Sequence, residues 1–298
     1  MPPIPPPRAS GFTTSTDIPL YWCSYGQAGG KQLLILHGGP GAHHDYLLPQ
    51  MLRLGTDGTP RELLFYDQRG GGRSRTDDRA REGDVTWRTN VLDLERVVAE
   101  LKAEPLSLVG YSWGGLLALL YAREAAAGRV RPAPARLILI DPAPLSRRHR
   151  IAFEAEFERR QASTEVRALR EELARSGLRE RDPASYRQRA FELSVASYFA
   201  DPRRARDLTP FRVTGRVQQS VWASLGDFDL ASDPELSAIT CPTLIVHGRQ
   251  DPIPLASSEE CARALGARLV VLDQCGHVPY VEQPDALFGA IEQFLTNS

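Results

Sequence analysis

The sequence predicts an α/β protein with a mainly parallel β-sheet, helices on both faces and one helical insertion. Six short apolar runs have the length and composition of buried strands, at residues 33–36, 63–66, 106–109, 137–140, 244–246 and 269–272. Amphipathic segments of helical length separate most of these runs. Such alternation favours parallel pairing, because a crossover helix returns the chain to the end of the sheet where the next strand begins.

Two of the expected helices lie at residues 87–103 and 284–295. In the first of them, apolar side chains recur at helical spacing and share one stripe, made of Val91, Leu94, Val97, Val98 and Leu101. A stripe of this kind lets a helix bury one face against a sheet while the opposite face stays in water. We therefore expect both segments to be crossover or flanking helices of the sheet.

The character of the chain changes between residues 142 and 234. Strand patterns disappear there, and arginine and glutamate become frequent. Some of these charges stand four residues apart, as Glu156 and Arg160 do, which is typical of ion pairs on the wet face of a helix. We expect this stretch to be a helical insertion, so that residues 1–141 and 235–298 form the two parts of one core.

Composition and charge restrict the classes of partner. With 298 residues and a formal net charge of −1, the chain has no overall charge that would favour nucleic acid or an anionic membrane. Its four cysteines show neither zinc nor redox spacing, so we expect reduced thiols. The proline-rich residues 1–7 lack the cationic start and apolar core of a secretory signal, and an extended or disordered arm is expected there. These features predict a cytoplasmic, soluble protein and carry no prediction of oligomeric state.

A glycine-rich turn at residues 110–115, with the sequence GYSWGG, joins a strand pattern to a helix pattern. Its Gly-x-Ser-x-Gly spacing is typical of a tight turn in which small residues let strand and helix approach each other. The serine backbone is strained in such a turn, and its hydroxyl is held where a substrate carbonyl can reach it. Ser112 is therefore the candidate nucleophile.

The groups that would activate Ser112 are expected after the carboxyl ends of other strands in the sheet. A serine hydroxyl needs a neutral imidazole to take its proton and a carboxylate to orient that imidazole. Asp251 follows the fifth apolar run and His277 follows the sixth, which gives the chain order serine, acid, histidine. Asp141, after the fourth run, is a second candidate for the acid. We favour Asp251, because its glycine-bearing turn lets the loop fold toward His277.

Acyl transfer also needs donors for the negative oxygen of the tetrahedral intermediate. One candidate is the backbone N–H of Trp113, directly after the candidate nucleophile. The second is expected from residues 37–41, with the sequence HGGPG, because glycines let a backbone N–H pass close to a substrate. Within that loop we favour Gly39, followed by Gly38.

The sequence carries no signal for a metal or a cofactor. It has no Gly-x-x-x-x-Gly-Lys-Ser/Thr loop that could hold a nucleotide phosphate. His43, His44 and Asp45 are adjacent in a loop and lack the spacing that places metal ligands on one face of a helix. Ser112 takes the place of the aspartate expected at this turn for epoxide or haloalkane hydrolysis. We therefore expect a hydrolase that needs neither a metal nor a cofactor.

Taken together, these motifs resemble the α/β-hydrolases and, among them, the proline iminopeptidase group of serine peptidases (family S33). The resemblance rests on residues 37–41, 67–70 followed by 72–74, 110–115, 247–251 and 276–277. It implies that Ser112, Asp251 and His277 form a catalytic triad, and that residues 142–234 form a helical cap over the site. The implied activity is release of N-terminal proline, or of another small residue, from short peptides through an acyl-enzyme. Residues 67–69 are interpreted as a structural, ion-paired turn.

The resemblance also implies that acidic cap residues recognise the free amino end of the substrate, beside an apolar pocket for the proline ring. Glu192 is the main candidate for the acid, with Phe191, Tyr198 and Trp222 as candidate pocket residues; Asp227 and Asp229 are further acids. The alternative function is a carboxylesterase that cleaves small acyl esters. A carbon–carbon bond hydrolase and a ligand-binding homologue without catalysis are the remaining alternatives. In each case the expected partner is a small molecule or a short peptide.

Overall fold

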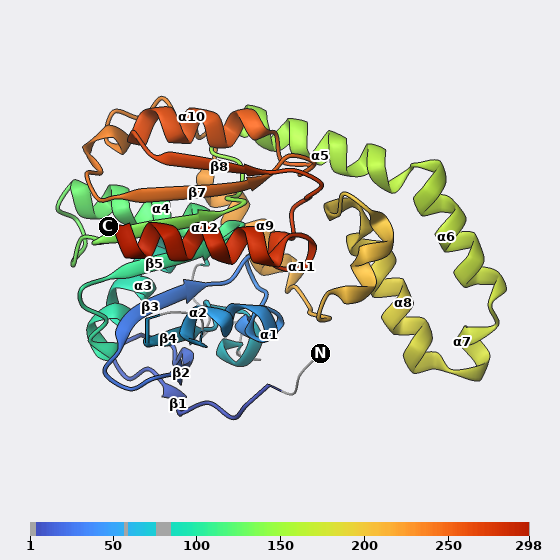
Figure 1. Cartoon of the computed structure of the whole chain (residues 1–298), viewed down its shortest axis with the longest axis horizontal. Helices are drawn as coiled ribbons and strands as arrows, with labels where there is room; N and C mark the ends of the chain where they lie inside the picture. The colour runs from blue at the N-terminus through green and yellow to red at the C-terminus, as the bar shows by residue number, and fades with distance from the viewer. Residues whose placement is uncertain (1–3, 57–58, 76–84, 298) are drawn as a thin grey trace.

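The computed structural model describes residues 4–56, 59–75 and 85–297, and these parts contain one eight-stranded sheet (Figure 1). Its strand order is β1-β2-β4-β3-β5-β6-β7-β8. The strands are β1 Ala9–Phe12, β2 Tyr21–Gly26, β3 Lys31–Leu36, β4 Arg61–Tyr66, β5 Ser107–Tyr111, β6 Arg136–Ile140, β7 Thr243–Gly248 and β8 Arg268–Leu272.

The strands from β3 to β8 are all parallel, with Leu34 of β3 opposite Leu64 of β4 on one side and Leu108 of β5 on the other. The predicted apolar runs lie in these six strands, so the expected α/β class is confirmed. β1 and β2, which were not predicted from the sequence, extend the sheet in antiparallel fashion. The sequence does not reveal them, because β1 is only half-buried and β2 is interrupted by Ser24, so neither contains a continuous apolar run.

Helices cover both faces of the sheet. One face carries α3 Trp87–Leu101, α4 Trp113–Ala126 and α10 Leu255–Leu265, and the other carries α1 Leu48–Met51, α2 Arg53–Thr56, α11 Pro279–Glu282 and α12 Pro284–Asn297. The two helices predicted from sequence are α3 and α12. Thr86 and Thr89 form a capping box at the start of α3, and Lys102 ends it in a left-handed conformation.

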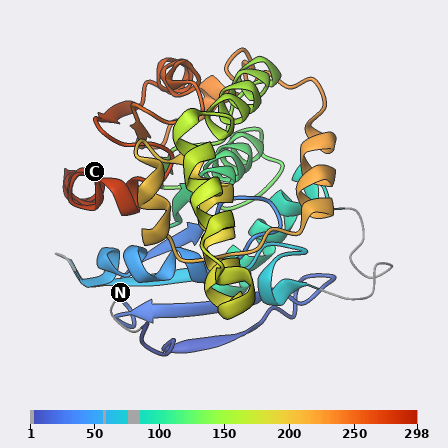
Figure 2. The ribbon, with the colours of Figure 1, turned by 90° about the vertical axis from the view of Figure 1, so that its right-hand side faces the viewer.

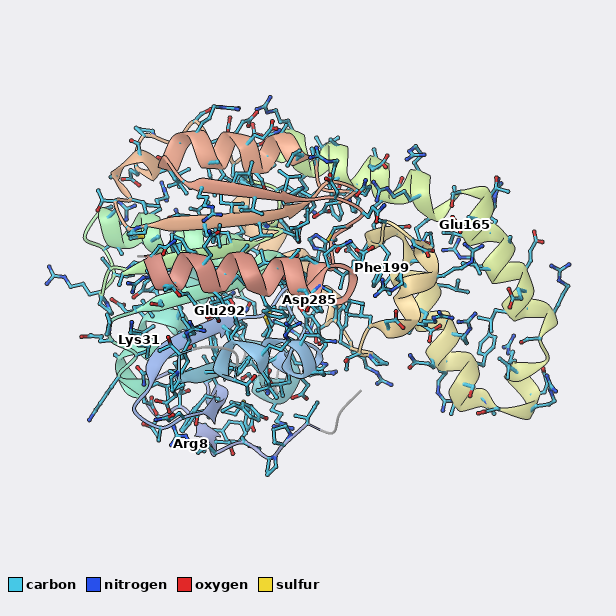
Figure 3. All side chains as sticks on the ribbon, viewed as in Figure 1. Arg8, Lys31, Glu165, Phe199, Asp285 and Glu292 are labelled. Atoms are coloured by element: carbon cyan, nitrogen blue, oxygen red, sulfur yellow. The ribbon has the colours of Figure 1, made fainter. Side chains whose placement is uncertain are left out.

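The chain between β6 and β7 is helical. This cap segment, residues 142–234, contains α5 Arg147–Gln161, α6 Thr164–Arg175, α7 Leu178–Arg181, α8 Pro183–Val195, α9 Gly215–Leu225 and the short 3-10 helices Ala196–Tyr198 and Pro202–Asp207. Helices α6, α7 and α8 project beyond one end of the sheet and pass in front of it in the second view (Figures 1 and 2). Phe199 lies where the segment meets the core, whereas Glu165 lies on α6 (Figure 3).

Ion pairs hold several of these parts in place. Glu156 pairs with Arg160 at 2.6 Å on α5, as the spacing of the two residues predicts. In the turn after β4, the buried Arg69 bonds to Asp93 of α3 and to Asp17. These contacts fix the turn between two other segments, which fits a structural role for residues 67–69.

The structure also bears on the proline-rich arm, the four cysteines and the length of the helices. Residues 1–3 of the predicted proline-rich arm lie outside the described residues, and residues 4–7 have no regular secondary structure. All four cysteines are free thiols. Every helix in the described ranges is too short or too polar to cross a bilayer.

Candidate active site

Ser112 lies in a sharp turn between β5 and α4. Its backbone has φ 53° and ψ −119°, a strained conformation for a residue with a side chain. The glycines beside it are required by close packing: a Cβ on Gly110 would lie 2.3 Å from the carbonyl oxygen of Gly114. A Cβ on Gly114 would meet the carbonyl oxygen of Leu36 at 2.2 Å. This packing of strand against helix is what the Gly-x-Ser-x-Gly pattern predicts, and it leaves Ser112 partly exposed.

Two loops at the carboxyl end of the sheet bring His277 and Asp251 to Ser112. His277 follows β8, and its Nε2 lies 3.0 Å from the Oγ of Ser112. Its Nδ1 lies 2.7 Å from Oδ2 of Asp251, which follows β7. The other carboxylate oxygen of Asp251 accepts the backbone N–H of Ile253 at 2.7 Å. The three predicted residues therefore form one continuous hydrogen-bonded chain, through which an imidazole can take a proton from a hydroxyl.

The charge state of His277 follows from its burial. The side chain is almost completely enclosed, and loss of hydration lowers its pKa to about 4. The imidazole is therefore neutral near pH 7 and carries one proton. The hydrogen bond to Asp251 places that proton on Nδ1, which leaves Nε2 as the acceptor that faces Ser112.

Asp141 lies beside this chain, at the end of β6. One of its oxygens accepts the N–H of Gly248 at 2.8 Å, and the other is buried without a hydrogen-bond donor from the described residues. Burial and the neighbouring charge of Asp251 raise the pKa of Asp141 well above its ordinary range. We therefore assign Asp141 as a neutral carboxylic acid that donates a hydrogen bond to Asp251. Asp251, and not Asp141, is the carboxylate in contact with His277.

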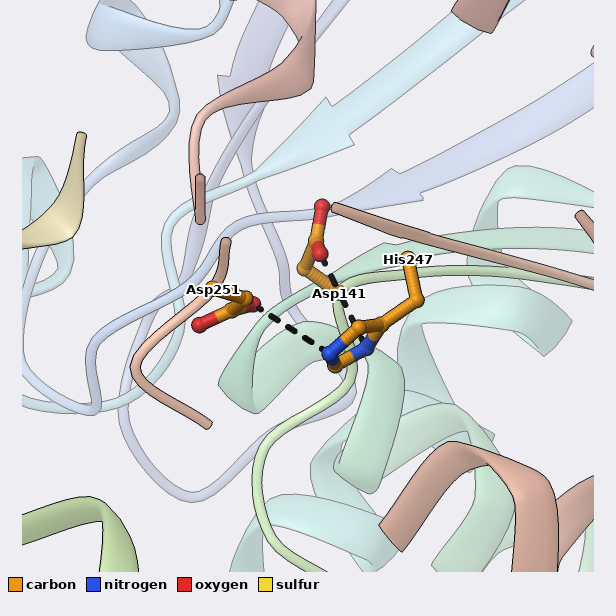
Figure 4. Close-up of side chains that lie close together, drawn as sticks. All are labelled: Asp141, His247 and Asp251. Carbon is orange, nitrogen blue, oxygen red and sulfur yellow. Dashed lines mark ion pairs between the residues drawn. The ribbon is translucent and has the colours of Figure 1, made fainter. Parts of the chain in front are cut away.

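Asp141, His247 and Asp251 bring one ligand atom each within 4.8 Å of one another (Figure 4). Among the described residues, these three form the one cluster of histidine, cysteine and acidic side chains whose spacing would suit a metal ion. Both nitrogens of His247 already have partners, however, in the hydroxyl of Ser258 and the carbonyl of Ile253. Because Asp251 is likewise engaged by His277, the donor set does not fit a metal.

The candidate oxyanion donors lie in two neighbouring turns. The backbone N–H groups of Trp113 and Gly39 have no hydrogen-bond acceptor among the described residues. The N–H of Gly38, in contrast, donates to the hydroxyl of Tyr46 at 2.8 Å. Gly38 is still needed as glycine, because a Cβ there would lie 2.9 Å from the Cβ of Ser112. The geometry therefore leaves Gly39 and Trp113 with free N–H groups, and Gly38 with a packing role.

The cap segment contacts the site through aromatic side chains. Tyr198 stacks on His277 with 5.0 Å between ring centroids, and its carbonyl accepts the backbone N–H of His277 at 2.7 Å. Trp222 packs edge-on against Trp113 at 5.9 Å. Tyr198 and Trp222 line a cavity of about 370 Å³, which we call the aromatic cavity. Its wall also contains Phe153, Phe157, Arg150, Glu154, Glu158, Gly215, Gln218 and Gln219.

Glu192 lies apart from this group. Its two carboxylate oxygens are bonded to Arg189 at 2.7 Å and to Gln188 at 3.1 Å, all within α8. It lines a different cavity of about 220 Å³, whereas Phe191, its neighbour on α8, packs against Phe211. The structure therefore brings Tyr198 and Trp222 to the site but not Glu192. The two further acids are also engaged elsewhere, since Asp229 bonds to Ser232 and Asp227 pairs with Arg147.

Three residues that support the site were not selected from sequence. The hydroxyl of Tyr111 donates to the carbonyl of His277 at 2.9 Å. Gln68 bonds to the carbonyl of His37 and to the indole N–H of Trp113, so it joins the two turns that carry the free amides. Glu282 accepts the N–H of Gly276 from the histidine loop and of Ala200 from the cap segment, each at 2.8 Å. Gln68 lies inside a recognised motif, whereas no sequence pattern distinguishes Glu282.

An eight-stranded sheet in this order, with a Ser-His-Asp chain at its carboxyl end, defines an α/β-hydrolase. The chain belongs to the alpha/beta hydrolase family, which it matches over residues 33–290. Within that family it resembles proline iminopeptidases. The proline iminopeptidase of Saccharolobus solfataricus is 26% identical over 300 aligned positions, covering 96% of this chain and 91% of the relative.

A second relative is more similar over a shorter stretch. The proline iminopeptidase of Lactobacillus delbrueckii subsp. lactis is 42% identical over 89 residues, and the match spans only 30% of each chain. Among solved structures, a proline iminopeptidase-related protein from Thermus thermophilus has a TM-score of 0.70 at 23% identity, with 97% of each chain covered. An esterase from Exiguobacterium antarcticum has a TM-score of 0.68 at 22% identity, covering 97% of this chain and all of the esterase. These two similarities show the fold alone.

Proposed function

We propose that this hydrolase is a serine aminopeptidase that releases an N-terminal residue, with proline the first candidate, through an acyl-Ser112 intermediate. The observation that carries the proposal is the hydrogen-bonded chain from Ser112 through His277 to Asp251. The reaction needs neither a metal nor a cofactor, since the imidazole supplies the base and the backbone supplies the oxyanion donors.

In the first step, Nε2 of His277 takes the proton of Ser112 as the hydroxyl oxygen attacks the scissile carbonyl. The buried Asp251 stabilises the imidazolium that forms. The N–H groups of Gly39 and Trp113 bind the oxygen that becomes negative, and loss of one such donor costs about 3–4 kcal/mol in transition-state stabilisation. His277 then protonates the leaving amine, and a water molecule hydrolyses the acyl-enzyme by the same proton path in reverse.

The choice of an aminopeptidase rests on the similarity to proline iminopeptidases and on the aromatic cavity. Tyr198 and Trp222 form its inner wall beside His277 and Trp113, which suits a flat apolar ring. Glu158 lies on the same wall and supplies negative charge for a substrate ammonium group, whereas Glu154 is paired with Arg150 at 2.8 Å. Glu192, the acid favoured from sequence, is not included in this proposal, because Arg189 and Gln188 neutralise and occupy it.

A carboxylesterase is the second candidate function. The observation in its favour is that no half-buried acid with free oxygens lines the aromatic cavity among the described residues, since Glu154 and Glu158 are both exposed. An exposed carboxylate discriminates weakly between a charged and a neutral substrate end. The esterase from Exiguobacterium antarcticum shares the fold, and the same triad would cleave small acyl esters.

The deciding experiment compares L-proline p-nitroanilide with its N-acetylated form, and p-nitrophenyl acetate with both. An aminopeptidase cleaves the free-amine anilide and rejects the acetylated one. Equal turnover of the two anilides, or turnover of the ester alone, would contradict the aminopeptidase and support the esterase. Ser112→Ala should abolish activity and fluorophosphonate labelling, whereas Ser237→Ala, an exposed serine outside the site, serves as the matched control.

A further inference from the structure

A third cavity, of about 850 Å³, lies between α8 of the cap segment and the loops that carry the candidate oxyanion donors. We call it the arginine cleft. Its wall consists of Gly41, His43, Gly72 and Arg75 from the core, Ala184, Arg187, Gln188 and Phe191 from α8, and residues 210–215 from the cap segment. No acidic residue is among these described wall residues, and three of them are arginines, namely Arg75, Arg187 and Arg212.

The charge of these arginines is not neutralised within the described parts of the chain. None of the three forms a hydrogen bond or ion pair there. Arg187 does act electrostatically on Asp182, but the carboxylate of Asp182 already binds the backbone and hydroxyl of Ser185. This contrasts with the arginines elsewhere on the cap segment that pair with nearby acids, such as Arg160 with Glu156. Counting the described residues alone, the cleft therefore presents cationic groups without partners beside the site.

The cleft adjoins the candidate oxyanion loop directly. Residue Thr214 donates its N–H to the carbonyl of Gly41 at 2.9 Å, and Val213 lies 3.6 Å from where a Cβ on Gly39 would stand. Phe211 stacks on Tyr46 at 4.4 Å, and Tyr46 accepts the N–H of Gly38. The backbone that carries Arg212 is thus packed on the loop that holds the free amide of Gly39. One molecule can therefore contact this arginine and the candidate oxyanion loop together.

The aromatic cavity and the arginine cleft differ in their chemistry and share Gly215 in their walls. The aromatic cavity contacts His277 and Trp113 through its rings, whereas the cleft is reached from the Gly39–Gly41 side of the site. A substrate that spans the site therefore places one end against aromatic rings and the other against cations. Guanidinium groups bind carboxylates through paired N–H donors, which suits the free end of a peptide.

We propose that the arginine cleft binds a carboxylate on the leaving-group side of the substrate, so that short peptides with a free C-terminus are the preferred substrates. That the substrate is a peptide rests on the proposed function. The preference for a carboxylate concerns only the leaving group and does not depend on that function. The arginines are exposed, so each bond to a carboxylate is partly screened by water. Each arginine is expected to change KM by about 2- to 5-fold.

The test uses two substrates with the same acyl group, L-prolyl-4-aminobenzoate and L-prolyl-4-aminobenzamide. The full-length protein should have a lower KM for the carboxylate than for the amide. Arg187→Gln and Arg212→Gln should each raise KM for the carboxylate about 2- to 5-fold and leave KM for the amide unchanged. Arg167→Gln, an exposed arginine of α6 that does not line the cleft, is the matched control. Each variant is compared with the wild type on the same substrate, so that the difference in reactivity between the two leaving groups does not affect the result.

A second pair of substrates separates this inference from the proposed function. 4-Acetoxybenzoate and its methyl ester place the same carboxylate, or a neutral ester, on a phenol leaving group. One outcome would contradict the aminopeptidase and still support the carboxylate site. In it, neither prolyl compound is cleaved, but 4-acetoxybenzoate is cleaved with a lower KM than its methyl ester. This preference must also disappear in the double variant Arg187→Gln/Arg212→Gln. Equal KM values within each cleaved pair in the wild type, or a preference that survives in the double variant, would overturn the carboxylate site. Thermal melting of each variant confirms that the fold is unchanged.

Discussion

The carboxyl group of Asp141 lies fully buried next to that of Asp251, at the ends of neighbouring parallel strands. Their nearest carboxyl oxygens lie within 4.8 Å of each other. Two buried carboxylates so close together cannot both be charged without a compensating cation, so they share a proton. Asp251 receives a hydrogen bond from His277 and from the backbone of Ile253, which stabilise its charge. Asp141 therefore holds the proton, and it positions the carboxylate that orients His277.

The first prediction follows from this relationship. Asp141→Asn keeps an oxygen for the N–H of Gly248 and an N–H donor for Asp251, so kcat/KM should stay within about 3-fold of the wild type. Asp141→Ala removes the proton donor beside Asp251 and leaves the buried N–H of Gly248 without an acceptor, which costs about 1–3 kcal/mol. Thermal melting and steady-state kinetics on both variants check this. If the alanine variant were as stable and active as the asparagine variant, the shared hydrogen bond would be unimportant.

The second prediction concerns cooperation within the proposed triad. Ser112→Ala and His277→Ala should each lower kcat by several orders of magnitude, and the double variant should be no worse than either single one. The reason is that the proton path fails completely once one member is lost. Far-UV circular dichroism should show an unchanged fold in all three proteins. Additive losses in the double variant would show that the two side chains act independently.

The third prediction concerns pH. The imidazole of His277 must be neutral to accept the proton of Ser112, so kcat/KM rises as pH increases through the pKa of this residue. Burial lowers that pKa to about 4, and the acidic limb of the profile is therefore expected well below the value of about 6.5 for an ordinary histidine. A profile of kcat/KM from mildly acidic to neutral pH measures the limb. A midpoint at or above that of an ordinary histidine would mean that hydration or the charge of Asp251 outweighs the burial.

The fourth prediction concerns packing behind the nucleophile. In Gly38→Ala the new methyl group would lie 2.9 Å from the Cβ of Ser112 and 3.0 Å from the ring of Tyr111, closer than van der Waals contact allows. We expect a loss of about 1–3 kcal/mol in stability and a marked fall in kcat. Gly289→Ala is the matched control, because its Cβ would meet nothing within 4 Å and it lies in α12. Equal melting temperatures for the two variants would contradict the steric argument.

The parallel part of the sheet and the three residues of the hydrogen-bonded chain were predictable because their signals are local. Buried strands have continuous apolar runs, and Ser112, Asp251 and His277 each follow such a run. Strand β2 was missed because Ser24 interrupts its apolar run, although residues 22–26 of the strand pair with β4. The position of Glu192 was not predictable, since a helix of charged residues does not reveal which face meets the core. Contacts between distant segments, such as that of Glu282 with Ala200, leave no local pattern at all.

The contact between the cap segment and His277 has a consequence for how such proteins can diversify. The carbonyl of Tyr198 accepts the backbone N–H of the histidine, so the bond depends on the path of the chain and not on which side chain stands there. Substrate-binding side chains on the cap segment are free to vary, provided that this main-chain route is kept. An exchange of the whole segment with that of a relative would have to preserve this route first. A displaced carbonyl would release His277 even with Ser112, Asp251 and His277 all present.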